Sequence, residues 1–124
     1  MYGIFVNENG CIHYADLIVS GVKLFETRNR NMLSALIGKR VAIIRTRRGK
    51  KPVIVGQADI EYGYFFTAEE FDKCRDLTCI PEGSMYDCHG KGKWLYKMGN
   101  PWKADTPVEL PASAIRHGRS WCEF

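Results

Sequence analysis

Lys23, Glu26 and Arg28 belong to one short segment, and their types and spacing could support chemistry. Residues two apart on a β-strand point to the same face, so Glu26 and Arg28 would lie side by side on a strand. Lys23 comes three residues before Glu26 and would point to the opposite face of an ideal strand. It can join the other two only if the chain turns between a preceding helix and the strand, and Gly21 permits such a turn.

A converged cluster of these three side chains has three interpretations. In a binding site, the planar guanidinium of Arg28 would hold a phosphate or a base edge, and Lys23 would add a point charge. Glu26 would then orient Arg28 or accept a hydrogen bond from an exocyclic amine. In an enzyme, burial near Arg28 would keep Lys23 partly neutral as a base, while Glu26 would activate water or protonate a leaving amine. In a purely structural role, the three would form salt bridges that tie a helix to a strand.

Sequence periodicity predicts the elements that must position this cluster. Apolar residues recur at helical spacing over 14–18, and Gly21 can end that helix. Thr67 and Glu70 fit a capping box at the start of a second helix. Strands are predicted over 2–6, 24–28, 41–46, 53–60, 94–98, 108–110 and 120–124, with a turn at 99–101 and a loop over 77–93.

The length and composition indicate a single globular domain over 1–124. With 45% hydrophobic and 26% charged residues, the chain is not of a disordered class. Several short strands and two or so short helices predict a small α+β domain, a partly closed β-barrel with helices at its side. No apolar run approaches the roughly 18 residues of a membrane span, and the first ten residues lack the features of a signal peptide. We therefore expect a cytoplasmic protein with no membrane partner.

The charge is segregated along the chain, although the net charge is only +4. Between Thr27 and Ala58 there is no acidic residue. The cations in this interval are Arg28, Arg30, Lys39, Arg40, Arg45, Arg47, Arg48, Lys50 and Lys51. A positive patch of this kind suits the backbone of a nucleic acid. The alternative is a basic hairpin that is merely solvated.

The segment from Gly21 to Arg28 resembles the Gly-x-Lys-x-x-Glu-x-Arg pattern of the ASCH family, the activating signal cointegrator homology domains of the PUA-like group. The segments 38–43 and 55–58 are similar to the two strands that follow in that family. The segment 116–121 looks like the family's closing strand, with its Gly and Trp. The resemblance covers most of the chain but leaves the loop over 77–93 unexplained.

The resemblance implies a small β-barrel with a cleft beside the first helix, close to the PUA RNA-binding fold. Family members are associated with RNA binding and with transcription coactivators. Some bacterial members deacetylate acetylcytidine, and others have been proposed as ribonucleases. The deacetylating enzymes look to have a threonine nucleophile where this chain has Glu26, and Thr27 is expected to face away on the strand. Glu69, Glu70 and Glu82 are candidates for a third, acidic role, although the capping box already accounts for Glu70.

We therefore predict recognition of RNA, a nucleotide or a modified nucleoside in a cleft lined by Lys23, Glu26 and Arg28. The residues expected to attract the phosphates are Arg45, Arg47, Arg48, Lys50 and Lys51. Trp121 is expected to border the cleft, where an aromatic ring could stack on a base. Two alternatives remain: a small amidohydrolase or ribonuclease that uses Lys23 and Glu26, and a module whose basic hairpin contacts an acidic protein.

The five cysteines are expected to be mostly reduced thiols, because an odd and sparse set is not typical of a disulfide scaffold. The spacing of Cys74, Cys79, Cys88 and His89 poorly fits a structural zinc site. Cys74 is instead expected on the buried face of the second helix, and no metal or cofactor is predicted. His13 and His117 are expected to be surface or hydrogen-bonded residues.

Overall fold

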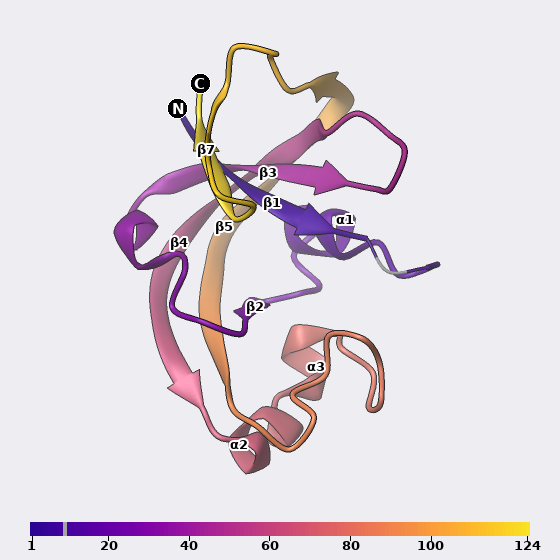
Figure 1. Cartoon of the computed structure of the whole chain (residues 1–124), viewed down its shortest axis with the longest axis vertical. Helices are drawn as coiled ribbons and strands as arrows, with labels where there is room; N and C mark the ends of the chain where they lie inside the picture. The colour runs from indigo at the N-terminus through magenta and orange to yellow at the C-terminus, as the bar shows by residue number, and fades with distance from the viewer. Residues whose placement is uncertain (9) are drawn as a thin grey trace.

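A strongly curved, seven-stranded mixed sheet forms the framework of the computed structural model, which describes residues 1–8 and 10–124 (Figure 1). The strand order is β2 (Phe25–Arg28), β5 (Lys93–Glu109), β4 (Val53–Phe66), β3 (Arg40–Thr46), β1 (Tyr2–Asn7), β7 (Trp121–Glu123) and β6 (Ile115–His117). Only β1 and β3 pair in parallel. Parallel neighbours need a crossover connection, and the chain between them forms a helix, β2 and a short 3-10 helix, η1 (Ser34–Leu36).

The centre of the sheet is buried on both faces, as the continuous apolar run of β3 indicates. Residues 41–44 of β3 are all buried. The main core packs helix α1 (Tyr14–Val19) against the sheet. A smaller cluster of Phe5, Ile44 and Cys122 packs on its own. These two clusters fix β1 and β3, which hold one side of the site described below.

The α+β class is confirmed, but the predicted barrel closure is wrong for the residues that the structure describes. The order ends at β2 and β6, which do not pair. The edge strand β2 pairs only with β5, and its link to β1 is a side chain: Arg28 Nη2 donates to the carbonyl of Phe5 at 2.7 Å. The sheet is therefore open, with a seam between β2 and β1 that the Arg28 side chain bridges.

Strands β4 and β5 form one long antiparallel ribbon instead of the shorter strands predicted. The strand predicted over 53–60 continues to Phe66, and β5 runs through the expected turn at 99–101. The register shifts in three places, one of them between Gln57 and Asp59, so Asn100 and Pro101 have no paired partner there. A bulge tolerates a proline, which has no N–H to donate, and it also bends the strands.

Helix α1 lies unusually close to this ribbon because β4 has a glycine at the contact. A Cβ atom at Gly56 would lie 2.7 Å from Val19 Cγ1 and 2.0 Å from the carbonyl oxygen of Trp102. After α1, Gly21 adopts a positive φ of 80°. The amides of Val22 and Lys23 both donate to the carbonyl of Leu17 at 2.9 Å. The turn that the sequence allowed between helix and strand is thus present.

Two further short helices, α2 (Ala68–Lys73) and α3 (Arg75–Thr78), follow β4 at the far end of the ribbon (Figure 1). The predicted capping box at α2 is confirmed, since Thr67 Oγ1 accepts from the Glu70 amide and Glu70 Oε1 accepts from the Thr67 amide. Cys74 caps α2 and is only half-buried, whereas full burial was expected. The α3 helix and η1 were not predicted. No helix among the described residues is long and apolar enough to span a membrane.

Candidate functional site

A cavity of about 200 Å³ opens at the seam between β2 and β1. Strand β1 contributes residues 5–7, and β2 with the residues after it contributes Glu26, Thr27, Arg28 and Asn29. The other lining residues are Tyr14, Lys23, Met32, Ile80, Tyr86, Lys93 and Arg119. The cavity therefore unites segments from both ends of the chain around the three residues that the sequence singled out.

Lys23 is 1% exposed and lies inside this cavity wall. Its Nζ donates to the carbonyl of Thr78 at 2.5 Å and lies 3.9 Å from Glu26 Oε1. It also lies 5.0 Å from the centre of the Tyr14 ring, a cation–π distance. Burial lowers the pKa of Lys23 to about 8, against an opposing effect of the Glu26 carboxylate. About a tenth of the side chain is then neutral at pH 7, which a base or proton shuttle requires.

Arg28 is held by three acceptors, with no other carboxylate than that of Glu26. Its Nη2 lies 3.1 Å from Glu26 Oε2 and also donates to Phe5, and its Nη1 donates to Ser120 Oγ at 2.9 Å. The guanidinium thus joins β2, β1 and the turn before β7. These bonds are consistent with the structural interpretation, in which a salt-bridged cluster fastens separate elements.

Lys93 is a second buried lysine of the cavity, and the sequence analysis missed it. It is 5% exposed and its Nζ donates to the carbonyl of Tyr86 at 2.5 Å. Burial lowers its pKa, while the Glu26 carboxylate acts in the opposite direction. The position lies at the boundary of a loop and a strand, and nothing in its local sequence shows that a non-local turn carries Tyr86 over it.

The loop over 79–92 supplies the outer wall through Ile80 and Tyr86. Asp87 anchors this loop: its carboxylate accepts from the amides of Gly83 and Cys88 and from Arg75 Nη2. The backbone hydrogen bond from Gly83 is the largest of the effects that hold the pKa of Asp87 well below its ordinary value. The unexplained loop of the sequence is therefore a fixed part of the cavity.

The other predicted site residues lie outside this cavity. Arg45, Arg47 and Lys50 border a separate hollow, together with Lys51, Val53 and Glu109. Arg48 is exposed and borders neither hollow. Trp121 does not line the cavity; its ring stacks on His117, with centroids 4.0 Å apart. The expectation that Trp121 borders the cleft is not met.

The acidic and metal-ligating candidates also separate. Glu69, Glu70 and Glu82 do not line the cavity, and Glu26 is its one carboxylate among the described residues. Thr27, which was expected to face away, does border it. Of the cysteine and histidine set, only Cys88 lies in a group with metal-ligand spacing, and its companions there are Asp72 and Asp87 rather than Cys74, Cys79 or His89.

The fold is that of ASCH domains. A solved serine-to-alanine mutant of the ASCH protein from Zymomonas mobilis superposes with a TM-score of 0.72 at 20% identity, over 96% of this chain and 85% of that chain. The structure titled ASCH from the same organism gives 0.66 at 19% identity, over 87% and 73%. A tyrosine-to-phenylalanine mutant gives 0.65 at 20% identity, over 87% and 76%. No protein-family model and no curated protein matches the chain.

Proposed function

We propose that the cavity binds one unit of an RNA chain, a nucleotide or a modified nucleoside. The observation that carries the proposal is the imbalance of charge around a small, partly buried space. Four cationic side chains line the cavity, against the single carboxylate of Glu26. These cations are Lys23, Arg28, Lys93 and Arg119. An anionic ligand would offset this excess positive charge, and buried cations act on it more strongly than solvent-exposed ones.

The size of the cavity favours a single nucleotide unit over a duplex. Ligand pockets for drug-sized molecules usually measure about 300–1,000 Å³, whereas this one measures about 200 Å³. Tyr14 and Tyr86 border it, and their rings pack edge to face, 5.7 Å between centroids. Single-stranded RNA is recognised chiefly through unstacked bases placed against aromatic and polar side chains. The likeness to ASCH structures fits this proposal at the level of the fold.

The basic segment from Arg45 to Lys51 gives the rest of an RNA chain a place to continue. Asn7, which lines the cavity, pairs with Thr46 in the β1–β3 register, so the segment begins one strand away from the cavity. The exposed cations there would follow the phosphates without reading sequence.

Fluorescence anisotropy with a labelled single-stranded RNA tests the proposal. The variants Lys23→Met and Lys93→Met should weaken binding about 10- to 100-fold, because each removes a hydrogen-bonding charge from the site. Lys97→Met is the matched control, since Lys97 lies on β5 outside the cavity and pairs with Glu61 at 3.7 Å. Equal affinity of all four proteins would overturn the proposal.

A hydrolase remains the second candidate because of one observation, the proximity of a buried lysine with a pKa of about 8 to a buried carboxylate. Neutral Lys23 would take a proton from a water molecule that attacks the acyl carbon, and the released amine would receive a proton. Mass spectrometry of RNA oligonucleotides and N-acylated cytidines after incubation distinguishes the two. A product that Lys23→Met abolishes would establish turnover, whereas saturable binding without product would leave a binding module.

A further inference from the structure

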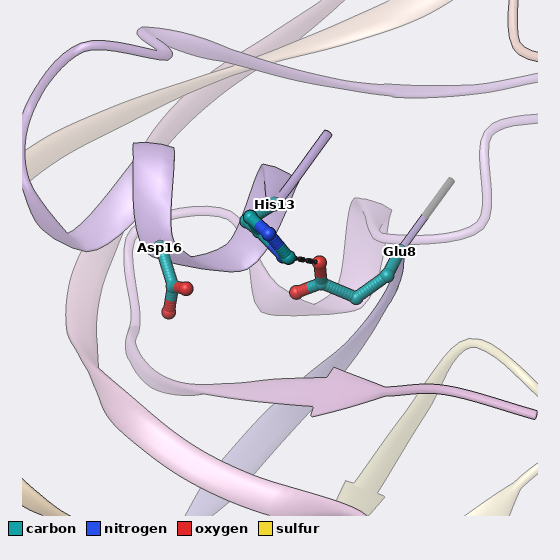
Figure 2. Close-up of side chains that lie close together, drawn as sticks. All are labelled: Glu8, His13 and Asp16. Atoms are coloured by element: carbon teal, nitrogen blue, oxygen red, sulfur yellow. Dashed lines mark hydrogen bonds and ion pairs between the residues drawn. The ribbon is translucent and has the colours of Figure 1, made fainter. Parts of the chain in front are cut away.

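Three potential metal ligands meet outside the cavity, where the chain passes from β1 to α1: Glu8, His13 and Asp16. Each offers one ligand atom, and these atoms lie within 4.8 Å of one another. Figure 2 shows Glu8 on one segment and the other two residues on the segment that enters α1. His13 Nδ1 and Glu8 Oε2 are in direct contact.

Glu8 gives an independent indication that this cluster receives a cation. Its side chain is 5% exposed. Its second oxygen, Oε1, is buried and has no hydrogen-bond partner among the residues that the structure describes. Burying a carboxylate oxygen without a partner is costly, and coordination to a metal ion is one of the few ways to offset that cost. The Glu8 backbone is itself fixed, since its amide donates to the carbonyl of Thr46 at 3.0 Å.

We propose that Glu8, His13 and Asp16 bind a divalent transition-metal ion, with zinc as the reference ion. The donor set decides the class of metal. One imidazole nitrogen and two carboxylate oxygens suit zinc and its neighbours in the first transition row, whereas calcium and magnesium prefer oxygen ligands alone. Three protein ligands leave a further position for water, so the ion is partly exposed rather than enclosed.

Two neighbouring groups set how tightly the ion is held. Arg45 Nη1 lies 3.7 Å from Asp16 Oδ2, so its guanidinium competes with a metal for this carboxylate. A proton between His13 and Glu8 competes for the other two ligands. The ion would link two parts of the cavity wall, because the chain neighbours of Glu8 and His13, Asn7 and Tyr14, both line the cavity.

Isothermal titration with zinc chloride, using the full chain, tests this site. The wild type should bind one ion in this site, and His13→Gln should weaken binding by about 100-fold or more, beyond the 10- to 100-fold loss typical of an outer-shell partner. His13 is half-exposed, with 51% of its side chain accessible, so this variant should fold. His117→Gln is the matched control: His117 also contacts a carboxylate, Glu123, at 3.1 Å, but belongs to no group of three ligands among the described residues.

Two further measurements distinguish this site from the second group with metal-ligand spacing, Asp72, Asp87 and Cys88. Arg45→Gln removes the competing cation at Asp16 and should tighten binding several-fold. Cobalt bound through nitrogen and oxygen should show no thiolate charge-transfer band, whereas cobalt bound through Cys88 would produce one. Absence of zinc binding, equal affinity of His13→Gln and the wild type, or a loss of binding in Cys88→Ser would each overturn the proposal.

Discussion

The cavity and the basic segment from Arg45 to Lys51 both carry positive charge, but the molecule holds that charge in different ways. In the cavity, backbone carbonyls and Glu26 fix Lys23, Arg28 and Lys93 in place. In the basic segment most of the side chains are exposed, and the ion pair of Lys51 with Glu109 spans 3.8 Å between well-exposed groups. The first arrangement determines geometry and stability; the second supplies a field that salt screens.

Arg28→Ala should have the largest effect on stability and would break the comparison if it did not. Removal of one partner from a buried ionic network costs about 3–5 kcal/mol. Arg28→Lys should recover only part of this, because an ammonium cannot reach three acceptors with a planar fork. The free energy of unfolding from urea titrations measures both variants. The control is Arg40→Ala, whose guanidinium pairs with Asp59 at 3.0 Å on the surface and should cost at most about 1 kcal/mol.

Lys23 should make the stability of the wild type rise with pH in the alkaline range. Its pKa is lowered from 10.5 to about 8 in the folded protein, so between these values the unfolded chain binds more protons. Stability therefore increases as pH rises through 8 toward 10, by on the order of 1–3 kcal/mol. Chemical denaturation of the wild type and Lys23→Met across this range measures the difference. Parallel profiles for the two proteins would contradict the burial of a protonated lysine.

Asp87→Asn should loosen the loop that forms the outer wall of the cavity. The loss of a carboxylate that accepts from two amides and a guanidinium should lower the free energy of unfolding at pH 7 by about 1–3 kcal/mol. The pKa of Asp87 is lowered in the folded state, so its contribution is present above the ordinary pKa of an aspartate and is lost as pH falls below it. The gap between wild type and variant should therefore shrink in acid. Asp105→Asn, at an exposed position, is the control.

The basic segment should contribute least to stability and most to salt dependence. Changing Arg47, Arg48 and Lys50 together to Gln should alter the free energy of unfolding by no more than about 0.5 kcal/mol. It should also lower the slope of log affinity for single-stranded RNA against log salt by about 0.7 for each phosphate that the variant no longer neutralises. Anisotropy titrations at several salt concentrations measure this slope. An unchanged slope would assign RNA attraction to the cavity alone.

Local sequence signals predicted the parts of the fold that local physics determines. The turn at Gly21 and the capping box at Thr67 depend on neighbouring residues, and both are present. The ASCH fold was predicted from the spacing of residues 21–28 together with the strands that follow. The convergence of Lys23, Glu26 and Arg28 followed from the same spacing once the turn was allowed.

Features that depend on distant pairings were not predicted. The bulges that carry β5 through residues 99–101 arise from its register with β4, which no local pattern shows. Lys93 is buried because the loop folds over it and Tyr86 accepts its hydrogen bond. Trp121 lies away from the cavity because its ring packs on His117 and on Tyr2, at the other side of β1. Its aromatic type alone gave no information on which face of the sheet it would occupy.

The seam between β2 and β1 also determines how fast the cavity can admit a molecule. Two strands joined by a backbone ladder separate only through local unfolding, which is slow and costs many hydrogen bonds at once. Here Arg28 crosses the seam with one side chain. Rotation about its χ angles is a much faster kind of motion than separation of a ladder. Entry at this point is therefore governed by the rotamer exchange of a single arginine, while the sheet on either side stays intact.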